Sequence, residues 1–408
     1  MKILHFADAH NGSDMTGPVD AESGLPLRLE DFLKSMDTIA EHVETEGIDL
    51  VVFAGDAFKD RNPNPTLERE FARRIQRMAS SAPVVLIVGN HDVPGAFGKA
   101  HTLEIYNVLE VGQVYIVDRP RLLEIPTESG VVQVVGIPWP TRHNVMAKEA
   151  FQGVPAEEID KLIADAVAEK IKELAGQLDP ELPSILAAHL TIEGGDMGGG
   201  TPVGLGGGIT LPLEALALEQ FDYVALGHLH RYQRLHDNPP VVYSGSIERI
   251  DFGEEMDQKG FVVVTLGKYE DDDLFGNAAF TKDEFIPLKV RDFRTIRVHL
   301  DGTDPTDAVL GSIHEEQIEG AVVRVIIEGT SQSAAMLDDA VIHRALEPAL
   351  RSSVVKNIDR EVRMRLDGPS YEEMGPMDLL AAYLESKGTG QEEQERLVQA
   401  AEELMVGV

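Results

Sequence analysis

The sequence predicts an α/β fold: a sandwich of β-sheets flanked by helices, followed by a small α+β domain and a pair of C-terminal helices. Two observations predict the sandwich. Apolar runs of strand length recur through the first two thirds of the chain, and their continuous rather than alternating apolar character is typical of strands covered on both faces. Amphipathic helical patterns lie between some of these runs, and this alternation of strand and helix indicates α/β architecture.

The strands expected in the sandwich are eight short apolar runs. They comprise residues 2–7, 49–54, 84–88, 131–137, 184–188, 223–226, 241–243 and 261–266. Two helices are expected beside them, each from apolar residues that recur three or four positions apart. The first stripe contains Leu67, Phe71, Ile75 and Met78, and the second contains Ile159, Ile163, Val167 and Ile171.

The character of the chain changes near Thr281. Amphipathic strands are expected at 285–300 and 321–328, a helix near 335–350 and a last strand at about 358–366. A chain of 408 residues is long enough for two or three domains. We therefore expect the sandwich domain at 1–280, a small α+β domain at 281–366 and a helical region at 367–408.

Two short amphipathic helices are expected at the C-terminal end, at 376–386 and 391–406, with a glycine-containing break between them. Pro376 suits the first position of a helix, where its missing N–H costs nothing. Met377, Leu380 and Leu384 then line one face of the first helix. Helices this short are marginal alone, so each apolar face must be buried. The pattern by itself favours packing on the chain's own α+β domain.

Composition limits the possible functions. With 36 basic and 70 acidic residues the net charge is −34, which argues against nucleic-acid binding unless divalent cations or a partner supply positive charge. The absence of cysteine excludes disulfides and thiolate metal sites and fits a cytoplasmic location. We expect no signal peptide and no membrane span.

A stretch rich in glycine, residues 194–208, contains nine glycines. It is open to two interpretations, a mobile surface loop or a phosphate-binding loop. The stretch lacks the Lys-Ser/Thr ending and the helix start that a phosphate-binding loop needs. We therefore favour the surface loop.

Five polar motifs follow the ends of predicted strands. They are Asp8-Ala9-His10, Gly55-Asp56, Gly89-Asn90-His91-Asp92, His189 and Gly227-His228-Leu229-His230. Each alone has an ordinary structural explanation, such as a turn or a buried histidine. Ligands of α/β proteins gather at the carboxyl ends of strands, so five such motifs in this position make chance implausible and predict one common site.

The residue types in the motifs predict the chemistry. Carboxylate, imidazole and amide oxygen without thiolate suit manganese, iron or zinc. Two divalent ions roughly 3.5–4 Å apart can neutralise a phosphodiester, lower the pKa of a water and hold the attacking and leaving oxygens in line. The motifs therefore predict a two-metal phosphoesterase.

The order of the five motifs resembles the calcineurin-like metallophosphoesterase superfamily. Within it, the segment Tyr243–Glu255 (YSGSIERIDFGEE) and the following Lys259–Phe261 are similar to SbcD-type DNA nucleases. Gly55–Phe58 and Ala188–Leu190 are similar to the same family. The resemblance covers residues 1–265 well and the later regions in layout more than in motif.

The resemblance implies a ligand set with Asp56 as the bridge between two metal ions. One ion would be held by Asp8, His10, Asp56 and His230, and the other by Asp56, Asn90, His189 and His228. His91 would not ligate but would stabilise the transition state or protonate the leaving 3′ oxygen. Asp92 would orient His91; a solvent-facing turn carboxylate is an equally good interpretation of that residue.

Contacts with DNA are expected from three basic residues. Some family members carry a histidine where this chain has Lys59. This difference leaves open how the DNA strand is oriented at that position. Lys59 and Arg61 are candidates for phosphate contacts, as is Arg249 in the Tyr243–Glu255 segment. The basic edge of the α+β domain, which contains Lys289, Arg291, Arg294 and Arg297, is either a DNA-directing surface or a solvated strand face.

The function implied by the resemblance is a DNA nuclease with 3′-to-5′ exonuclease activity on duplex ends and endonuclease activity on single strands. It would use two divalent ions, with Mn²⁺ expected, and an SbcC-type coiled-coil ATPase bound through residues 369–408. A homodimer is also implied, with the helix around 66–80 as a possible contact. The alternatives are a phosphatase or nucleotidase for small esters, and a scaffold without activity; the complete ligand set counts against the scaffold.

Overall fold

The computed structural model describes residues 1–93, 100–109, 111–142, 154–198, 208–268, 279–300, 304–359, 375–386 and 390–406. The chain divides into two compact units. One unit comprises Met1–Thr295 with Ile318–Val323 and Pro348–Arg351. The other comprises Ile296–Gln317, Arg324–Glu347 and Ser352–Val408.

The first unit is built on two six-stranded sheets. The first sheet has the order β14 (Ala279–Pro287), β13 (Gly260–Lys268), β1 (Lys2–Phe6), β2 (Leu50–Phe53), β3 (Val84–Ile87) and β4 (Val114–Val117). The second has the order β11 (Gln233–Asp237), β12 (Pro240–Tyr243), β10 (Tyr223–Gly227), β7 (Ser184–His189), β6 (Gly130–Ile137) and β5 (Arg121–Thr127). Strands β1 to β4 are parallel, as are β6, β7, β10 and β12. In each sheet, the carboxyl ends of several parallel strands therefore lie side by side at the same end of the sheet.

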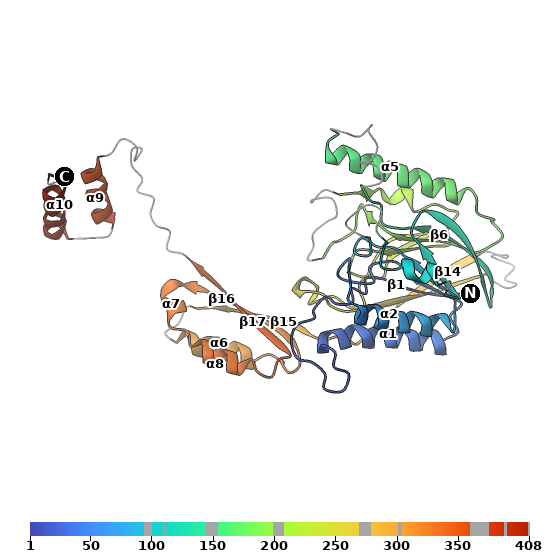
Figure 1. Ribbon diagram of the computed structural model, residues 1–408, viewed down its shortest axis with the longest axis horizontal. Coiled ribbons are helices and arrows are strands. Elements are labelled where there is room, and N and C mark those ends of the chain that lie inside the picture. Colours follow the sequence, from blue (N-terminus) through green and yellow to red (C-terminus); the bar gives the residue numbers. More distant parts are fainter. Residues whose placement is uncertain are drawn as a thin grey trace. The chain divides into compact units, whose positions relative to one another are not determined.

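Helices cover the outer faces of this sandwich (Figure 1). Helices α1 (Leu27–Thr45) and α2 (Pro65–Ala79) pack on the first sheet, and α5 (Ala156–Ala175) packs on the second. The smaller elements are α3 (Glu104–Val108), the 3₁₀ turns η2 (Leu213–Ala215) and η3 (Phe252–Glu254), and the pair β8 (Thr191–Ile192) and β9 (Thr210–Leu211).

Three apolar layers account for the continuous apolar runs. On β1, Leu4 and Phe6 face the helices, in a cluster that also contains Phe71 of α2. Ile3, on the opposite side of the same strand, joins the cluster between the two sheets, together with Ala187 of β7 and Ala225 of β10. Both faces of the central strands are thus buried, so these strands show no alternation of apolar and polar residues.

The eight predicted strands and the two predicted helices of the sandwich are confirmed. The sequence patterns did not reveal β4, β5 and β11 or most of β14, and these four are the edge strands of the two sheets. An edge strand pairs on one side only and is partly exposed, as the mixed burial along β5 and β11 shows. Polar residues interrupt β5 and β11, which therefore show no continuous apolar run. The strand β4 is apolar throughout but only four residues long.

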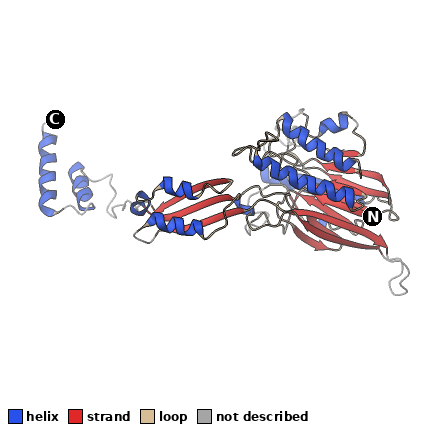
Figure 2. Ribbon diagram, turned by 90° about the horizontal axis from the view of Figure 1, so that it is seen from below, coloured by secondary structure: helices blue, strands red, loops and turns tan. Residues whose placement is uncertain are grey.

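The small α+β part contains a three-stranded sheet in the order β15 (Phe293–His299), β16 (Val322–Thr330) and β17 (Arg351–Asp359). Its helices are α6 (Pro305–His314), α7 (Ser331–Ala335) and α8 (Asp339–Ala345) (Figure 2). Ile296 and Val325 of the sheet are buried, as are Val309 of α6 and Ile342 of α8.

Three expectations for this part need correction. The strand expected at 285–300 is two strands, because the chain leaves β14 at Pro287 and starts β15 at Phe293. The helix expected near 335–350 is two short helices, since Asp338 caps a new helix. The strand expected at about 358–366 lies at Arg351–Asp359, and residues 360–366 lie outside the described residues.

The C-terminal helices α9 (Pro376–Ser386) and α10 (Gln391–Val406) have the predicted bounds. The side-chain amide of Gln394 in α10 donates a hydrogen bond to the carbonyl of Ala381 in α9, at 2.9 Å, and Leu384 is buried. Among the described helices, none is long and apolar enough to cross a membrane. In the glycine-rich stretch, residues 199–207 lie outside the described residues, so its interpretation is untested.

The packing of α2 gives a stability prediction. Phe71 is fully buried, and its ring lies 5.7 Å from that of Phe53 and 5.2 Å from that of Phe58. Phe71→Ala should lower the free energy of unfolding by about 3–5 kcal/mol, because the cavity cannot be refilled. Chemical denaturation measures this. The control is Arg73→Ala on the same helix, where the side chain is 64% exposed; an equal loss in both variants would contradict the assignment of the buried face.

Candidate metal centre

The five motifs meet where the carboxyl ends of the two sheets come together. Asp8 and His10 follow β1, Asp56 follows β2, and Asn90 follows β3, all in the first sheet. His189 ends β7, and His228 and His230 follow β10, all in the second sheet. The fold therefore brings these side chains together at one site, as the sequence predicts.

The backbone at the site is strained. Asp8, His10, Asp56 and His228 have φ values of 52°, 39°, 60° and 106°. Left-handed φ is uncommon for residues other than glycine. Among the described residues other than glycine, only Gln113 shares it. Strain of this kind persists where the surrounding structure imposes it, and it clusters at functional sites.

Hydrogen bonds hold the strained loops in place. The N–H of Asp8 donates to the carbonyl of Gly55 at 2.9 Å, and the N–H of His10 donates to the carbonyl of Asp56 at 3.0 Å. The N–H of His228 donates to the Asp8 carboxylate at 3.0 Å. This last bond joins the two sheets directly at the site.

Asp92 is fully buried. Its carboxylate accepts the N–H groups of Gly89, Asp56 and Ala57 at 2.9–3.0 Å. It therefore holds the loop that carries Asp56. The interpretation of Asp92 as a solvent-facing turn carboxylate is wrong, because that position has no exposed surface.

Close contacts with side chains of the site explain why two positions are glycine. A Cβ on Gly89 would lie 2.2 Å from Oδ1 of Asp56, and a Cβ on Gly55 would lie 2.3 Å from Nδ1 of His189. Any larger residue would displace a site side chain. These glycines are thus required by the packing of the site itself.

Asp56 lies between two groups of donor atoms. Its Oδ2 is 3.5 Å from Nε2 of His10 and 3.4 Å from Nε2 of His189. On one side, Nε2 of His10 is 3.0 Å from Nε2 of His230 and 3.9 Å from Oδ1 of Asp8. This is the arrangement expected of a bridging carboxylate with one ligand group beside it.

The second group lies on the other side of Asp56. Oδ1 of Asn90 is 3.0 Å from Nε2 of His189 and 3.0 Å from Nδ1 of His228. Nδ1 of His189 is 2.7 Å from the carbonyl of Ala54, which fixes the ring and leaves Nε2 toward the site. The ring of Trp139 packs on that of His228, with the ring centroids 4.7 Å apart.

The residues fit two divalent cations. Metal–nitrogen bonds of about 2.0–2.1 Å place neighbouring ligand atoms about 3 Å apart when they meet at a right angle, and three of the donor pairs lie at 3.0 Å. The donors are carboxylate, imidazole and amide oxygen, which is the set that manganese, iron or zinc accepts. Three groups of these side chains have ligand atoms close enough together to hold a metal ion.

The charges of the site are strongly coupled. Burial raises the pKa of Asp8 to about 6 and lowers the pKa of His228 to about 3. Burial opposes the charge of His189, but the nearby Asp56 carboxylate prevails and raises the pKa of His189 to about 9. Burial also opposes the charge of Asp56, but His189 and His10 hold its pKa below the usual range.

His91 is placed beside the bridge. Its N–H donates to Oδ1 of Asp56 at 2.8 Å, and its ring Nδ1 lies 2.6 Å from the carbonyl of Lys59. A carbonyl can only accept, so Nδ1 carries the hydrogen and Nε2 is left for other contacts. The Lys59 carbonyl, rather than Asp92, is therefore the group that orients the ring. His91 also belongs to a possible ligand cluster with His10 and Asp56.

The three candidate DNA contacts differ in their surroundings. Lys59 is half-buried and Arg61 is exposed. The guanidinium of Arg249 donates to the carbonyls of Arg291 at 2.7 Å and Asp257 at 3.3 Å. Arg249 thus has a structural role within this unit, and its contact with DNA remains a prediction.

The sequence patterns assigned no role to Glu254, Lys259 or Trp139, although the first two lie in or directly after the Tyr243–Glu255 segment. Glu254 contacts His230 and Lys259, and Trp139 contacts His228. The available signal was a lysine five residues after a glutamate, directly before the strand β13. That pattern alone does not distinguish an ion pair at a site from an ion pair in a turn.

Comparison with known proteins identifies relatives of the whole motif-bearing region. A model of the calcineurin-like phosphoesterase family matches residues 1–232. The SbcD subunit of the SbcCD nuclease from Bacillus subtilis (strain 168) is 30% identical over 275 residues, which cover 65% of this chain and 66% of that protein. The protein of the same name from Staphylococcus epidermidis is 29% identical over 292 residues, which cover 71% of this chain and 70% of that protein.

The matched region thus spans about two thirds of each relative's length. Among solved structures, a dimetal phosphatase from Danio rerio has 11% sequence identity, with 65% of this chain and 92% of that chain covered and a TM-score of 0.38. At that identity and TM-score the likeness carries no argument about function.

The charge coupling gives a prediction for metal binding. With a pKa of about 9, His189 keeps its proton near pH 7.5 when no cation is bound, whereas a ligating imidazole must be neutral. Mn²⁺ binding near pH 7.5 should therefore release about one proton per chain, and the affinity should rise with pH toward about 9. Calorimetry in buffers of different ionisation enthalpy measures the release. His189→Ala should abolish it, and a buffer-independent heat in the unaltered protein would contradict the coupling.

Proposed function

Because the chain belongs to the calcineurin-like phosphoesterase family, we propose that it is a metal-dependent DNA nuclease, the counterpart of SbcD in an SbcCD-type complex. The observation that carries the proposal is the position of Asp56, with Oδ2 at 3.5 Å from His10 and 3.4 Å from His189. The names of the two relatives support the substrate class.

Two divalent ions, Mn²⁺ in our proposal, would be held by the two donor groups. Asp8, His10, Asp56 and His230 would hold one, and Asp56, Asn90, His189 and His228 would hold the other. When bound, such ions neutralise phosphate oxygens and lower the pKa of an attacking water. The protein supplies the fixed carboxylates and imidazoles and the backbone that aims them.

His91 is the residue proposed to act on the leaving group. Its ring is fixed through Nδ1 by the Lys59 carbonyl, and its main chain is fixed by Asp56. Nε2 is then the atom that stabilises the transition state or hands a proton to the leaving 3′ oxygen. Asp92 supports this arrangement by holding the loop of Asp56.

The proposed substrate is DNA, cut from 3′ ends of duplexes and within single strands. The net charge of −34 is no obstacle, since the cations and a partner supply the positive charge that phosphate binding needs. Lys59, Arg61 and Arg249 are the proposed contacts. A phosphatase or nucleotidase for small esters is the less favoured alternative.

The α+β part, expected at residues 281–366, is proposed to direct DNA, and residues 369–408 are proposed to bind an SbcC-type coiled-coil ATPase. In α10, Leu397 is 45% exposed. An amphipathic helix with apolar residues at its surface suits helix-in-groove recognition. A cytoplasmic location is part of the same proposal.

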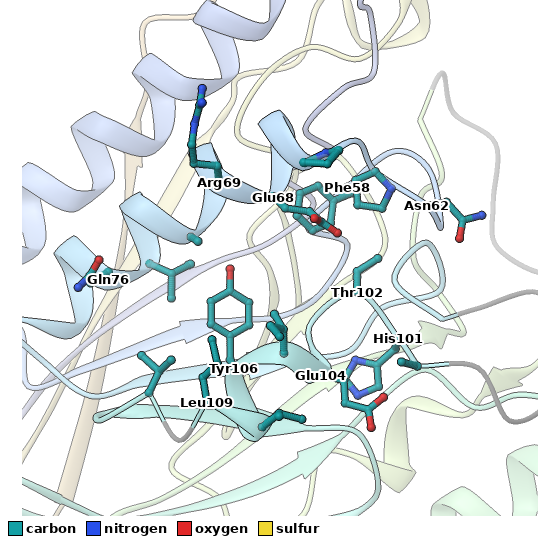
Figure 3. Close-up of a pocket in the computed structure, with 18 of the residues that line it drawn as sticks. Phe58, Asn62, Glu68, Arg69, Gln76, His101, Thr102, Glu104, Tyr106 and Leu109 are labelled. Carbon is teal, nitrogen blue, oxygen red and sulfur yellow. The ribbon is translucent and has the colours of Figure 1, made fainter.

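A homodimer is proposed through the surface formed by α2 and α3. Between these helices lies a hollow of about 890 Å³, lined by residues that include Phe58, Arg69 and Tyr106 (Figure 3). Ile105, Val108 and Leu109 also line this hollow, and they are 53%, 70% and 66% exposed. Large apolar side chains exposed together favour contact with another protein.

The two-metal assignment predicts different outcomes at two neighbouring residues. Asp56→Ala should abolish Mn²⁺-dependent cutting of a linear duplex and lower the metal content, because it removes the bridge. His91→Ala should keep both ions and DNA binding but lose at least ~10²-fold in rate. Nuclease assays and metal analysis of both variants check this. Near-normal activity in Asp56→Ala would refute the assignment, and metal loss in His91→Ala would make His91 a ligand.

The partner proposal predicts separable activities. Deleting residues 369–408 should leave a folded chain that cuts single strands with Mn²⁺, because the metal centre lies in the other unit. The deletion should abolish co-purification with the ATPase and the ATP-stimulated cutting of duplex ends. A truncated chain that still forms the stable complex would move the main interface elsewhere.

The dimer proposal predicts a change in assembly. Val108→Asp should convert the dimer to a monomer, because it places a charge in the apolar contact, and light scattering after gel filtration measures the mass. The matched control is Leu162→Asp on α5, where an apolar side chain is 43% exposed outside the proposed surface. A monomeric unaltered protein, or a dimer that survives Val108→Asp, would contradict the proposal.

A further inference from the structure

The ring of His230 is held from its far side by a carboxylate. Nδ1 of His230 lies 2.7 Å from Oε1 of Glu254, while Nε2 lies 3.0 Å from Nε2 of His10. A carboxylate accepts hydrogen bonds, so Nδ1 carries the hydrogen. The lone pair of His230 is then on Nε2, the atom directed at the site. Glu254 thus sets both the tautomer and the orientation of the ring.

Glu254 is itself fixed by several donors. It is 7% exposed. Its Oε2 accepts from the N–H of Ile250 at 3.0 Å and lies 3.4 Å from the hydroxyl of Ser246. Nζ of Lys259 lies 2.7 Å from the same oxygen. These contacts fix the Glu254 carboxylate in one position, and the carboxylate in turn fixes the ring of His230.

Lys259 contacts both the main chain of His230 and Glu254. Its side chain has no exposed surface, and a buried ammonium is costly unless it is paired. Nζ donates to the main-chain carbonyl of His230 at 2.9 Å as well as to Glu254. One lysine thus holds the backbone of His230 and the carboxylate that holds its ring.

We propose that Glu254 is a positioning residue for the metal ion held by Asp8, His10 and His230, and that Lys259 fixes Glu254 in that role. The inference rests on the proposed function, because it concerns one of the two proposed metal sites. Partners of ligating histidines typically contribute 10–100-fold in metal affinity. The expected effect is therefore on one ion and not on the other.

The test uses Glu254→Gln in the full-length chain, with Mn²⁺ alone as the probe. Calorimetry counts the ions and gives their affinities. The chain has one tryptophan, and Trp139 lies against His228 of the other site. Because quenching by Mn²⁺ weakens steeply with distance, the Trp139 signal should be dominated by the ion at that nearer site. We expect one ion to weaken by ~10–100-fold while the Trp139 titration stays unchanged, and nuclease activity to recover at high Mn²⁺.

The matched control is Glu248→Gln, at a buried glutamate in the same segment. Its carboxylate contacts the guanidinium of Arg28 and the main-chain N–H groups of Arg249 and Arg291 rather than a site histidine. This variant should bind both ions normally. If Glu254→Gln does not fold, Glu254→Asp keeps the charge beside Lys259 but withdraws the carboxylate from His230, and the same one-site loss is expected.

Two unaltered affinities in Glu254→Gln, or an equal loss in Glu248→Gln, would overturn the inference while leaving the proposed function intact. An unaltered protein that binds fewer than two Mn²⁺ ions would instead overturn the proposed function, and this inference with it.

Discussion

The structure depends on one carboxylate, that of Asp56, which must lie between imidazoles delivered by two different sheets. His10 comes from the first sheet and His189 from the second. The carboxyl ends of the strands in both sheets must therefore meet, and the apolar layer between the sheets holds the sheets together. A buried carboxylate is costly without compensating charge, so the site and the packing of the sandwich constrain each other.

The protein meets this constraint with strained backbone and tight packing. Four of the proposed ligand residues adopt left-handed φ, and there is no room for a Cβ at Gly55 or Gly89. Asp92 ties three N–H groups to the loop of Asp56. Strain is tolerated here because the surrounding core over-determines the loop conformation.

Charge on this chain has to be considered locally. The whole molecule is strongly acidic, yet the chemistry concerns a small buried group of carboxylates and imidazoles. Surface charges beyond about 10 Å are largely screened at moderate salt, whereas buried groups interact strongly. The acidic composition therefore bears on solubility and association, and the donor set bears on catalysis.

The sequence by itself determined which strands are buried on both faces, where they end, and which polar residues follow them. Those features are local, because apolar runs and strand-end motifs are contiguous in the chain. Only the tertiary structure decided the edge strands, the role of Asp92 and the contacts of Glu254 and Lys259 with His230. Each of these depends on groups brought together from distant segments, and no local pattern encodes the pairing of a carboxylate with a ring nitrogen 24 residues away.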